Sequence, residues 1–213
     1  MSFDIERHLG AVERSVSSLE RAGTTARAVV LARNYDTTID DLWDALTNGE
    51  RIPRWFLPIS GDLKLGGHFQ FEGNAGGEIT QCERPTKLAV SWEFASDTSW
   101  VEVRLSKRSD RNSRLTLTHT AHVYDFWNEY GPGAVGVGWE LGLFGLALHL
   151  AQPDAPRMDE SAFSTLPEGK AMATGSSEGW GQASIAAGTD PEEALEAVKR
   201  TTAFYTGEAS ETP

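Results

Sequence analysis

The side chains with the most potential for chemistry are two histidines in one alternating run of the sequence. His119 and His122 form an H-x-x-H pair. That spacing places two side chains on one face of a helix, but residues three apart in a strand point to opposite sides, so we expect no metal site from this pair. His119 instead shares a strand face with Leu117 and Ala121. It is predicted to be either a polar contact or proton donor in a cavity, or a hydrogen-bonded core histidine.

A third ionisable group, Glu140, lies near the middle of the apolar run 134–151. A buried carboxylate needs a partner or has a raised pKa. Two interpretations stay open: a polar group in a cavity, or a side chain that reaches the edge of a helix and pairs with an arginine. We disfavour a membrane span for this run, because a carboxylate in mid-span costs about 2.5–3.5 kcal/mol. His149, near the end of the run, is expected to face a rim.

The sequence carries no signature of cofactor or nucleophile chemistry. Cys82 is the single cysteine, which excludes an internal disulfide and a metal site built from cysteines. No neighbouring group would activate this thiol, so we expect it to be inert. The nucleophile elbow, the Walker loop and the dinucleotide fingerprint are all missing. We therefore predict no cofactor, no metal and no catalytic residues, and we favour a binding protein over an enzyme.

The composition restricts the partners. The chain has 213 residues, with 31 acidic and 19 basic side chains and a formal net charge of −12. Proteins that bind nucleic acids or anionic lipids rely on Lys and Arg, so neither partner is expected. A chain of this size buries roughly 70% of its unfolded surface and needs no metal to fold. The N-terminus shows no basic segment followed by an apolar run, so we expect no signal peptide and a cytoplasmic protein.

Hydrophobic periodicity predicts an α+β fold. Residues 1–23 are expected to form a short helix and a hairpin, followed by a strand over 25–33. A helix should begin after the capping residues 36–38 and end at Asn48-Gly49, with a short helix or turn at 54–57. Alternation then predicts the strand segments of an antiparallel meander with one covered face, at 62–65, 68–71, 78–82, 87–94, 100–105 and 114–123.

The covering element is predicted to be a long helix over 132–152, which is apolar nearly all round and therefore buried. We assign residues 24–152 to one domain and 153–207 to a helical C-terminal extension. Within the extension, one helix is expected near 166–187. A second begins at Asp190 and Pro191, which are typical of a helix start, and it ends near Gly207. Residues 208–213 are expected to form a loose tail.

The order of these elements resembles the Hsp90 ATPase activator homologue 1-like branch of the START-like (SRPBCC) superfamily. The segments that carry the resemblance lie within residues 24–151: DTTIDDLWDALTNGERIPRWFLP, GDLKLGGHFQF, GEITQCERPTKLAVSWEF, VEVRLSKR, RLTLTHTAH and GVGWELGLFGLALHL. The resemblance implies a helix-grip fold, in which a curved antiparallel sheet wraps around a long C-terminal helix and leaves a cavity between them. Related members bind lipids, hormones or polyketides, and some cyclise them. The branch takes its name from a eukaryotic co-chaperone domain.

The resemblance also implies which residues line the cavity. Our candidates are Trp43, Trp55, Phe56, Phe69, Phe71, Trp92, Phe94, Leu117, His119, Trp139, Glu140 and Phe144. Tyr124, Phe126 and Tyr130, in a loop before the long helix, would flank its mouth. We predict a non-enzymatic protein that binds a small hydrophobic or aromatic ligand. A co-chaperone-type interaction module and a polyketide cyclase or dehydratase, with His119 or Glu140 as general acid–base, stay as alternatives. The sequence leaves open whether the protein is a monomer or a homodimer.

Overall fold

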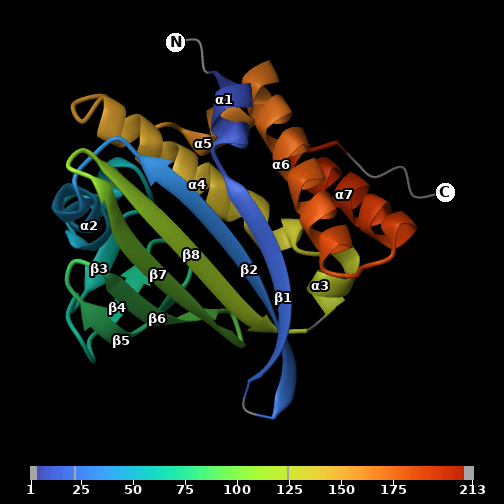
Figure 1. Cartoon of the computed structure of the whole chain (residues 1–213), viewed down its shortest axis with the longest axis horizontal. Coiled ribbons are helices and arrows are strands. Elements are labelled where there is room, and N and C mark those ends of the chain that lie inside the picture. Colours follow the sequence, from blue (N-terminus) through green and yellow to red (C-terminus); the bar gives the residue numbers. More distant parts are fainter. Residues whose placement is uncertain (1–3, 22, 124, 209–213) are drawn as a thin grey trace. The chain divides into compact units, whose positions relative to one another are not determined.

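The structure is a computed structural model that describes residues 4–21, 23–123 and 125–208 (Figure 1). The chain forms two compact units. Unit 1 contains the described residues up to Leu31, then His122–Leu141, and those from Met158 onward. Unit 2 contains Ala32–Ala121 and Gly142–Arg157. Both units are therefore built from segments that are far apart in the sequence.

An eight-stranded sheet has the strand order β1-β2-β8-β7-β6-β5-β4-β3. Its strands are β1 Glu13–Arg21, β2 Thr24–Tyr35, β3 Ile59–Gly61, β4 His68–Phe71, β5 Gly76–Glu83, β6 Lys87–Phe94, β7 Asp97–Ser109 and β8 Asn112–His122. Neighbours from β3 to β8 pair in an antiparallel manner. Together with the helices, this arrangement confirms the α+β class.

The N-terminal expectations are confirmed. A short helix, α1 (Ile5–Gly10), precedes the β1–β2 hairpin. The next helix, α2 (Ile39–Thr47), begins after Thr38, whose side chain accepts a hydrogen bond from the backbone of Asp41, and it ends at Asn48. A single 3-10 turn, η1 (Ile52–Arg54), follows and begins two residues before the predicted segment 54–57.

The strand predicted at 62–65 is wrong. The strand lies at β3, where Ile59 pairs with Phe71 and Gly61 pairs with Phe69. Gly61 has a φ of +114°, a backbone conformation that few other residues adopt, and the chain leaves the strand there. Leu65 is exposed, so the apolar alternation that suggested a strand does not reflect burial.

The strands β6, β7 and β8 confirm the predicted alternation. Leu88 pairs with Val103, Val90 with Val101, and Trp92 with Ser99. On the other side of β7, His119 pairs with Val101 and Leu117 with Val103. Residues that are directly opposite each other share a face of the sheet, so these side chains form one largely apolar face in unit 2.

The long apolar helix is α4 (Gly133–Ala151), as predicted. It is the one helix among the described residues that is long and apolar enough to cross a membrane, and half of its apolar window is buried inside the protein. Within unit 1, Gly136 lies against the indole of Trp180. Within unit 2, the hydroxyl of Tyr35 donates a hydrogen bond to the carbonyl of Leu143 (3.2 Å).

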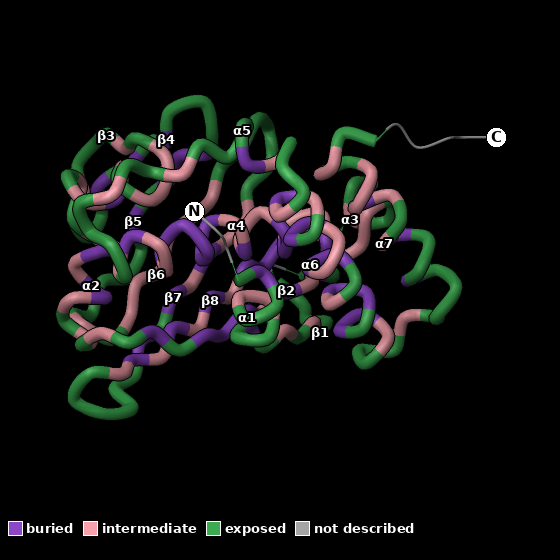
Figure 2. Tube along the Cα trace, turned by 90° about the horizontal axis from the view of Figure 1, so that it is seen from above, coloured by how far each residue is buried: buried purple, intermediate pink, exposed green. Residues whose placement is uncertain are grey.

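The C-terminal extension is helical and belongs to unit 1. The predicted helices are α6 (Pro167–Ala186) and α7 (Pro191–Thr206), which run side by side as an antiparallel pair (Figure 1). The side chain of Asp190 caps α7, and Gly207 ends it in a left-handed conformation. One side of α6 is buried, as the purple stretches in Figure 2 show, and it packs on α1, β1 and α7. Of the tail predicted at 208–213, all but the first residue lies outside the described residues.

Two short helices were not predicted: α3 (Asp125–Tyr130), where a loop was expected, and α5 (Glu160–Thr165). Each has six residues. A helix this short spans fewer than two turns, so its hydrophobic period cannot be distinguished from that of a loop.

The contact between α4 and α6 generates a stability prediction. A Cβ added at Gly136 would lie 2.1 Å from Cε2 of Trp180, which is fully buried and cannot move away freely. We expect Gly136→Ala to lower the free energy of unfolding by about 1–3 kcal/mol, because overpacking outweighs the better helix propensity of alanine. Urea unfolding would measure this change. The control is Gly10→Ala, where an added Cβ meets no atom within 4 Å. Equal stability of the two variants would contradict the prediction.

Candidate functional site

A cluster of aromatic rings lies on the apolar face of unit 2. Phe69 and Phe71 are buried there and pack edge-on against each other, with ring centroids 5.5 Å apart. Phe56, which follows η1, meets Phe71 edge-on at 5.0 Å. Trp92 on β6 lies 5.7 Å from Phe71 and 6.2 Å from Phe69. Edge-on and tilted pairs at such distances are favourable arrangements for aromatic rings.

Several apolar members of this cluster remain partly exposed. Phe56, Leu88, Val90 and Trp92 pack against the buried residues of the cluster but keep part of their surface accessible. Large apolar side chains usually lose most of their exposed surface in a core of this kind. We use the name aromatic face for Phe56, Phe69, Phe71, Trp92 and His119.

His119 is the polar member of the aromatic face. It is 7% exposed, its ring lies 6.3 Å from that of Trp92, and its Nε2 lies 2.8 Å from the hydroxyl of Ser99. Burial lowers the pKa of His119 to about 4, so the ring is neutral at pH 7. The side chain is therefore a neutral hydrogen-bonding group within an aromatic wall.

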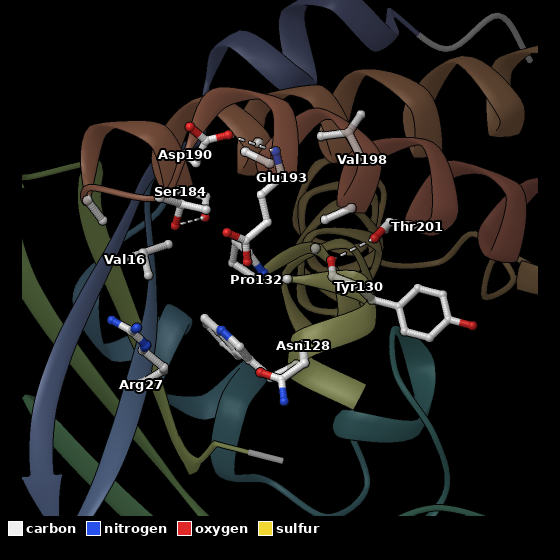
Figure 3. A pocket seen from close by; sticks show the side chains of 18 of the residues that line it. Val16, Arg27, Asn128, Tyr130, Pro132, Ser184, Asp190, Glu193, Val198 and Thr201 are labelled. Atoms are coloured by element: carbon white, nitrogen blue, oxygen red, sulfur yellow. Dashed lines mark hydrogen bonds between the residues drawn. The ribbon is translucent and has the colours of Figure 1, made fainter. Parts of the chain in front are cut away.

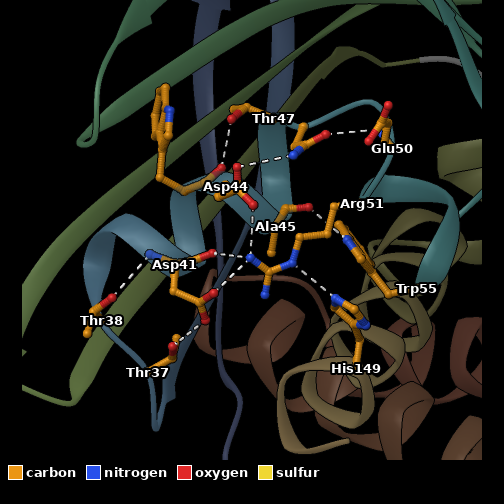
Figure 4. A network of polar contacts seen from close by, with 12 residues as sticks. Thr37, Thr38, Asp41, Asp44, Ala45, Thr47, Glu50, Arg51, Trp55 and His149 are labelled. Carbon is orange, nitrogen blue, oxygen red and sulfur yellow. Dashed lines mark hydrogen bonds and ion pairs between the residues drawn. The ribbon is translucent and has the colours of Figure 1, made fainter. Parts of the chain in front are cut away.

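A polar network holds the segment that carries Trp55 and Phe56 (Figure 4). The guanidinium of Arg51 donates to Asp41 at 2.8 Å, to Asp44 at 3.0 Å and, through Nε, to Nε2 of His149 at 3.1 Å. The indole of Trp55 donates to the carbonyl of Ala45 at 2.9 Å. These bonds tie η1 to α2 and to the end of α4 within unit 2.

His149 is buried, so the expectation that it faces a rim is wrong. Burial lowers its pKa, and the charges of Arg51 and Arg54 lower it further. The neutral imidazole can accept the hydrogen bond from Arg51, whereas a protonated ring could not.

The remaining candidates in unit 2 have different surroundings. Trp43, Leu117 and Phe144 are buried core residues. Phe94 is 57% exposed at the end of β6, where Ala95 turns the chain with a φ of +54°. It belongs to the predicted strand face but does not pack in the cluster of buried residues around Phe69 and Phe71.

Trp139 and Glu140 belong to unit 1. Glu140 is 1% exposed and forms a bidentate ion pair with Arg14 of β1, with N–O distances of 2.7 and 2.6 Å. Arg14 also donates to the carbonyl of Val12 and lies over Gly179 of α6. Of the two interpretations of Glu140, pairing with an arginine is therefore confirmed, although the pair is buried rather than at a helix edge.

Unit 1 contains a pocket of about 300 Å³ that sequence reasoning missed (Figure 3). Its lining comes from β1, β2, α3, the start of α4, α6, α7 and the loops beside them. Tyr130, expected at a cavity mouth, is one of the lining residues, whereas Phe126 packs against Tyr130 and Phe204. Tyr124 lies outside the described residues. The polar lining residues are scattered over the sequence, so no spacing pattern could have grouped them.

Comparisons with known proteins identify the family. Residues 36–151 match the family described as Activator of Hsp90 ATPase homolog 1-like protein. The chain belongs to this family. The crystal structure of CalU16 from Micromonospora echinospora, with 32% identity, matches with a TM-score of 0.66 over 81% of this chain and 98% of that one. The solution structure of CalU16 matches at 28% identity with a TM-score of 0.62 over 93% and 94% of the two chains.

A third structure, protein MLL2253 from Mesorhizobium loti, is 22% identical, with a TM-score of 0.52 over 60% of this chain and 99% of that one, and supports the fold alone. No curated protein matches the sequence. These findings confirm the resemblance to the Hsp90 activator homologue branch and the helix-grip fold. The likeness to CalU16 extends beyond the family match, because it covers 81% or more of the chain.

The buried ion pair generates a second stability prediction. Arg14→Met would leave the Glu140 carboxylate buried without its cation, and we expect a loss of about 3–5 kcal/mol in the free energy of unfolding. Urea unfolding would measure it. The control is Arg104→Met, which breaks the more exposed pair with Glu102 and should cost about 0–1 kcal/mol. The double variant Arg14→Met/Glu140→Gln should recover part of the loss. Similar small losses in both single variants would argue against a structural role for the buried pair.

His119 generates a prediction about pH. Its pKa of about 4 in the folded protein lies below the ordinary value of 6.5, so the unfolded chain takes up the proton first. The contribution of His119 to the free energy of unfolding is therefore complete above about pH 6.5. It falls by about 1.4 kcal/mol per pH unit as the pH drops from there toward 4. Urea unfolding of His119→Gln between these pH values should show a shallower decline than that of the unmodified protein. An equal decline would count against the prediction, and a variant of the exposed His68, His68→Gln, provides the control.

Proposed function

We propose that this protein binds a small hydrophobic or aromatic ligand on the aromatic face of unit 2 and does not alter it chemically. The observation that carries the proposal is the partial exposure of Phe56, Leu88, Val90 and Trp92 beside fully packed aromatic neighbours. An apolar ligand would cover this surface and gain about 25 cal/mol for each Å² removed from water.

The polar groups of the aromatic face favour a ligand with one hydrogen-bonding substituent. The neutral ring of His119 and the hydroxyl of Ser99 lie beside Trp92. Ligand pockets typically combine apolar walls with a few polar groups that fix orientation. The hydroxyl of Ser99 already donates to the carbonyl of Trp92 at 3.1 Å, so it can only accept from a ligand. A phenol or another neutral donor on an aromatic body therefore fits this chemistry.

Two observations weigh against the cyclase or dehydratase alternative. Both carboxylate oxygens of Glu140 accept hydrogen bonds from Arg14, so this group is already engaged in unit 1. Nε2 of His119 is within hydrogen-bond distance of Ser99. A general acid–base must instead reach the proton that it transfers in a bound substrate. The co-chaperone alternative rests on the name of the family, and the binding experiment below separates it from ligand binding.

The test is a titration with N-phenyl-1-naphthylamine, a neutral aromatic probe whose fluorescence rises in apolar surroundings. We expect saturable binding to the unmodified protein and an affinity about tenfold weaker for Trp92→Ala, because one aromatic wall is lost. Trp100→Ala is the matched control, since Trp100 pairs with Ser91 and lies on the opposite face of the sheet. Its affinity should stay unchanged.

Thermal unfolding of both variants, followed by circular dichroism, would establish that each is folded at the temperature of the titration. A reproducible small-molecule mass in native mass spectrometry, lost on denaturation, would then give the mass of the natural ligand. Lack of saturable probe binding, or an equal effect of both tryptophan variants, would overturn the proposal and favour the protein-interaction alternative.

A further inference from the structure

The pocket of unit 1 has a lining distinct in chemistry from the aromatic face. It is closed on one side by β1 and β2, which contribute Val16 and Arg27, and on another by α7, which contributes Glu193 (Figure 3). Its volume of about 300 Å³ is at the lower end of the range of known small-molecule sites. A ligand of amino-acid size would fit such a volume.

Arg27 supplies hydrogen-bond donors that the protein does not use. Its Nη1 donates to the hydroxyl of Ser18, while its Nε is buried and has no acceptor among the described residues. The buried Nε is closed to a ligand, but Arg27 lines the pocket and its guanidinium makes no hydrogen bond among the described residues other than the one to Ser18. The rest of the guanidinium can therefore donate to an acceptor that enters the pocket. A carboxylate suits it best, because its two oxygens match the planar fork of arginine.

Glu193 supplies the opposite charge. Its backbone N–H is bonded to the side chain of Asp190, but its carboxylate has no partner among the described residues. Figure 3 shows this side chain reaching from the first turn of α7 toward the middle of the pocket, with Arg27 and Asn128 across from it. An ammonium group would pair with this carboxylate.

The rest of the lining includes an apolar portion. Val16, Pro132, Ala197 and Val198 contribute aliphatic surface, and Trp127 contributes an aromatic ring. Glu193 and Asn128 are exposed, so the pocket opens to solvent on their side. A ligand can therefore enter with its charged groups near Arg27 and Glu193 and its apolar part against these walls.

We propose that the pocket of unit 1 binds a small amphipathic zwitterion of amino-acid size. Arg27 holds its carboxylate, Glu193 holds its ammonium group, and the aliphatic and indole walls cover an apolar side chain. This site is separate from the aromatic face and does not depend on the function proposed for it.

Isothermal titration calorimetry of the full chain with three related compounds tests the proposal. L-Phenylalanine carries both charges, 3-phenylpropionate lacks the ammonium group, and phenethylamine lacks the carboxylate. We expect L-phenylalanine to bind about tenfold more tightly than either single-charge analogue. Equal affinities for the three compounds, or no heat of binding for L-phenylalanine up to about 10 mM, would overturn the proposal.

Matched variants assign the two charges. Arg27→Met should weaken the binding of L-phenylalanine and 3-phenylpropionate by about tenfold and leave the binding of phenethylamine unchanged. Glu193→Gln should weaken the binding of L-phenylalanine and phenethylamine and leave the binding of 3-phenylpropionate unchanged. Glu192→Gln is the control for Glu193, since Glu192 is the adjacent exposed acid on α7 and is not part of the lining. Arg108→Met is the control for Arg27, because Arg108 is an exposed residue of unit 2.

Trp92→Ala separates this site from the aromatic face. It should leave the affinity for L-phenylalanine unchanged while it weakens binding of N-phenyl-1-naphthylamine. If Trp92→Ala weakens the binding of L-phenylalanine while Arg27→Met does not, the amino acid occupies the aromatic face and the proposal of a zwitterion site in unit 1 is wrong. If the naphthylamine fails to bind but L-phenylalanine shows the expected pattern, the zwitterion site stands and the function proposed for unit 2 fails.

Discussion

The arrangement of unit 1 depends on a carboxylate in the middle of an apolar helix. Glu140 is buried in α4, where an unpaired charge would be very costly. Arg14 reaches it from β1, and its guanidinium lies against Gly179 of α6, where an added Cβ would come within 2.9 Å of Nε. The ion pair thus joins β1 to α4, and the same arginine packs against α6 within this unit.

Glycines of α4 also leave room for side chains of α6 and α7. The indole of Trp180 fits against α4 because residue 136 has no side chain, and Gly133 leaves room for Thr201 of α7. The hydroxyl of Tyr205 then donates to the carbonyl of Ala134 at 3.1 Å. Glycine lowers the intrinsic stability of a helix, but here it lets the side chains of Trp180 and Thr201 lie close to the backbone of α4. The C-terminal helices therefore complete the core of unit 1, and the pocket lies beside the residues that hold them.

Sequence periodicity predicted those parts of the fold that repeat over many residues. The alternation of Leu88, Val90 and Trp92 placed them on one face, and the register with β7 puts them there. It could not predict the exposure of Phe94, which depends on the turn at Ala95, nor the pairing of Arg14 with Glu140, which are 126 positions apart. Local patterns carry no information about such distant partners, and the unit 1 pocket forms where segments that are far apart in the sequence meet.

The overall charge favours ligands without net charge at both proposed sites. A net charge of −12 repels anions at low ionic strength, so an acidic ligand would approach this protein slowly. A neutral aromatic compound is unaffected, and the neutral ring of His119 adds no charge to its site at pH 7. A zwitterion has no net charge either, yet it can still use a single arginine once it is inside a pocket. Both ligand classes therefore fit a strongly acidic protein better than a simple anion does, because the electric field of the protein slows the approach of anions to either site.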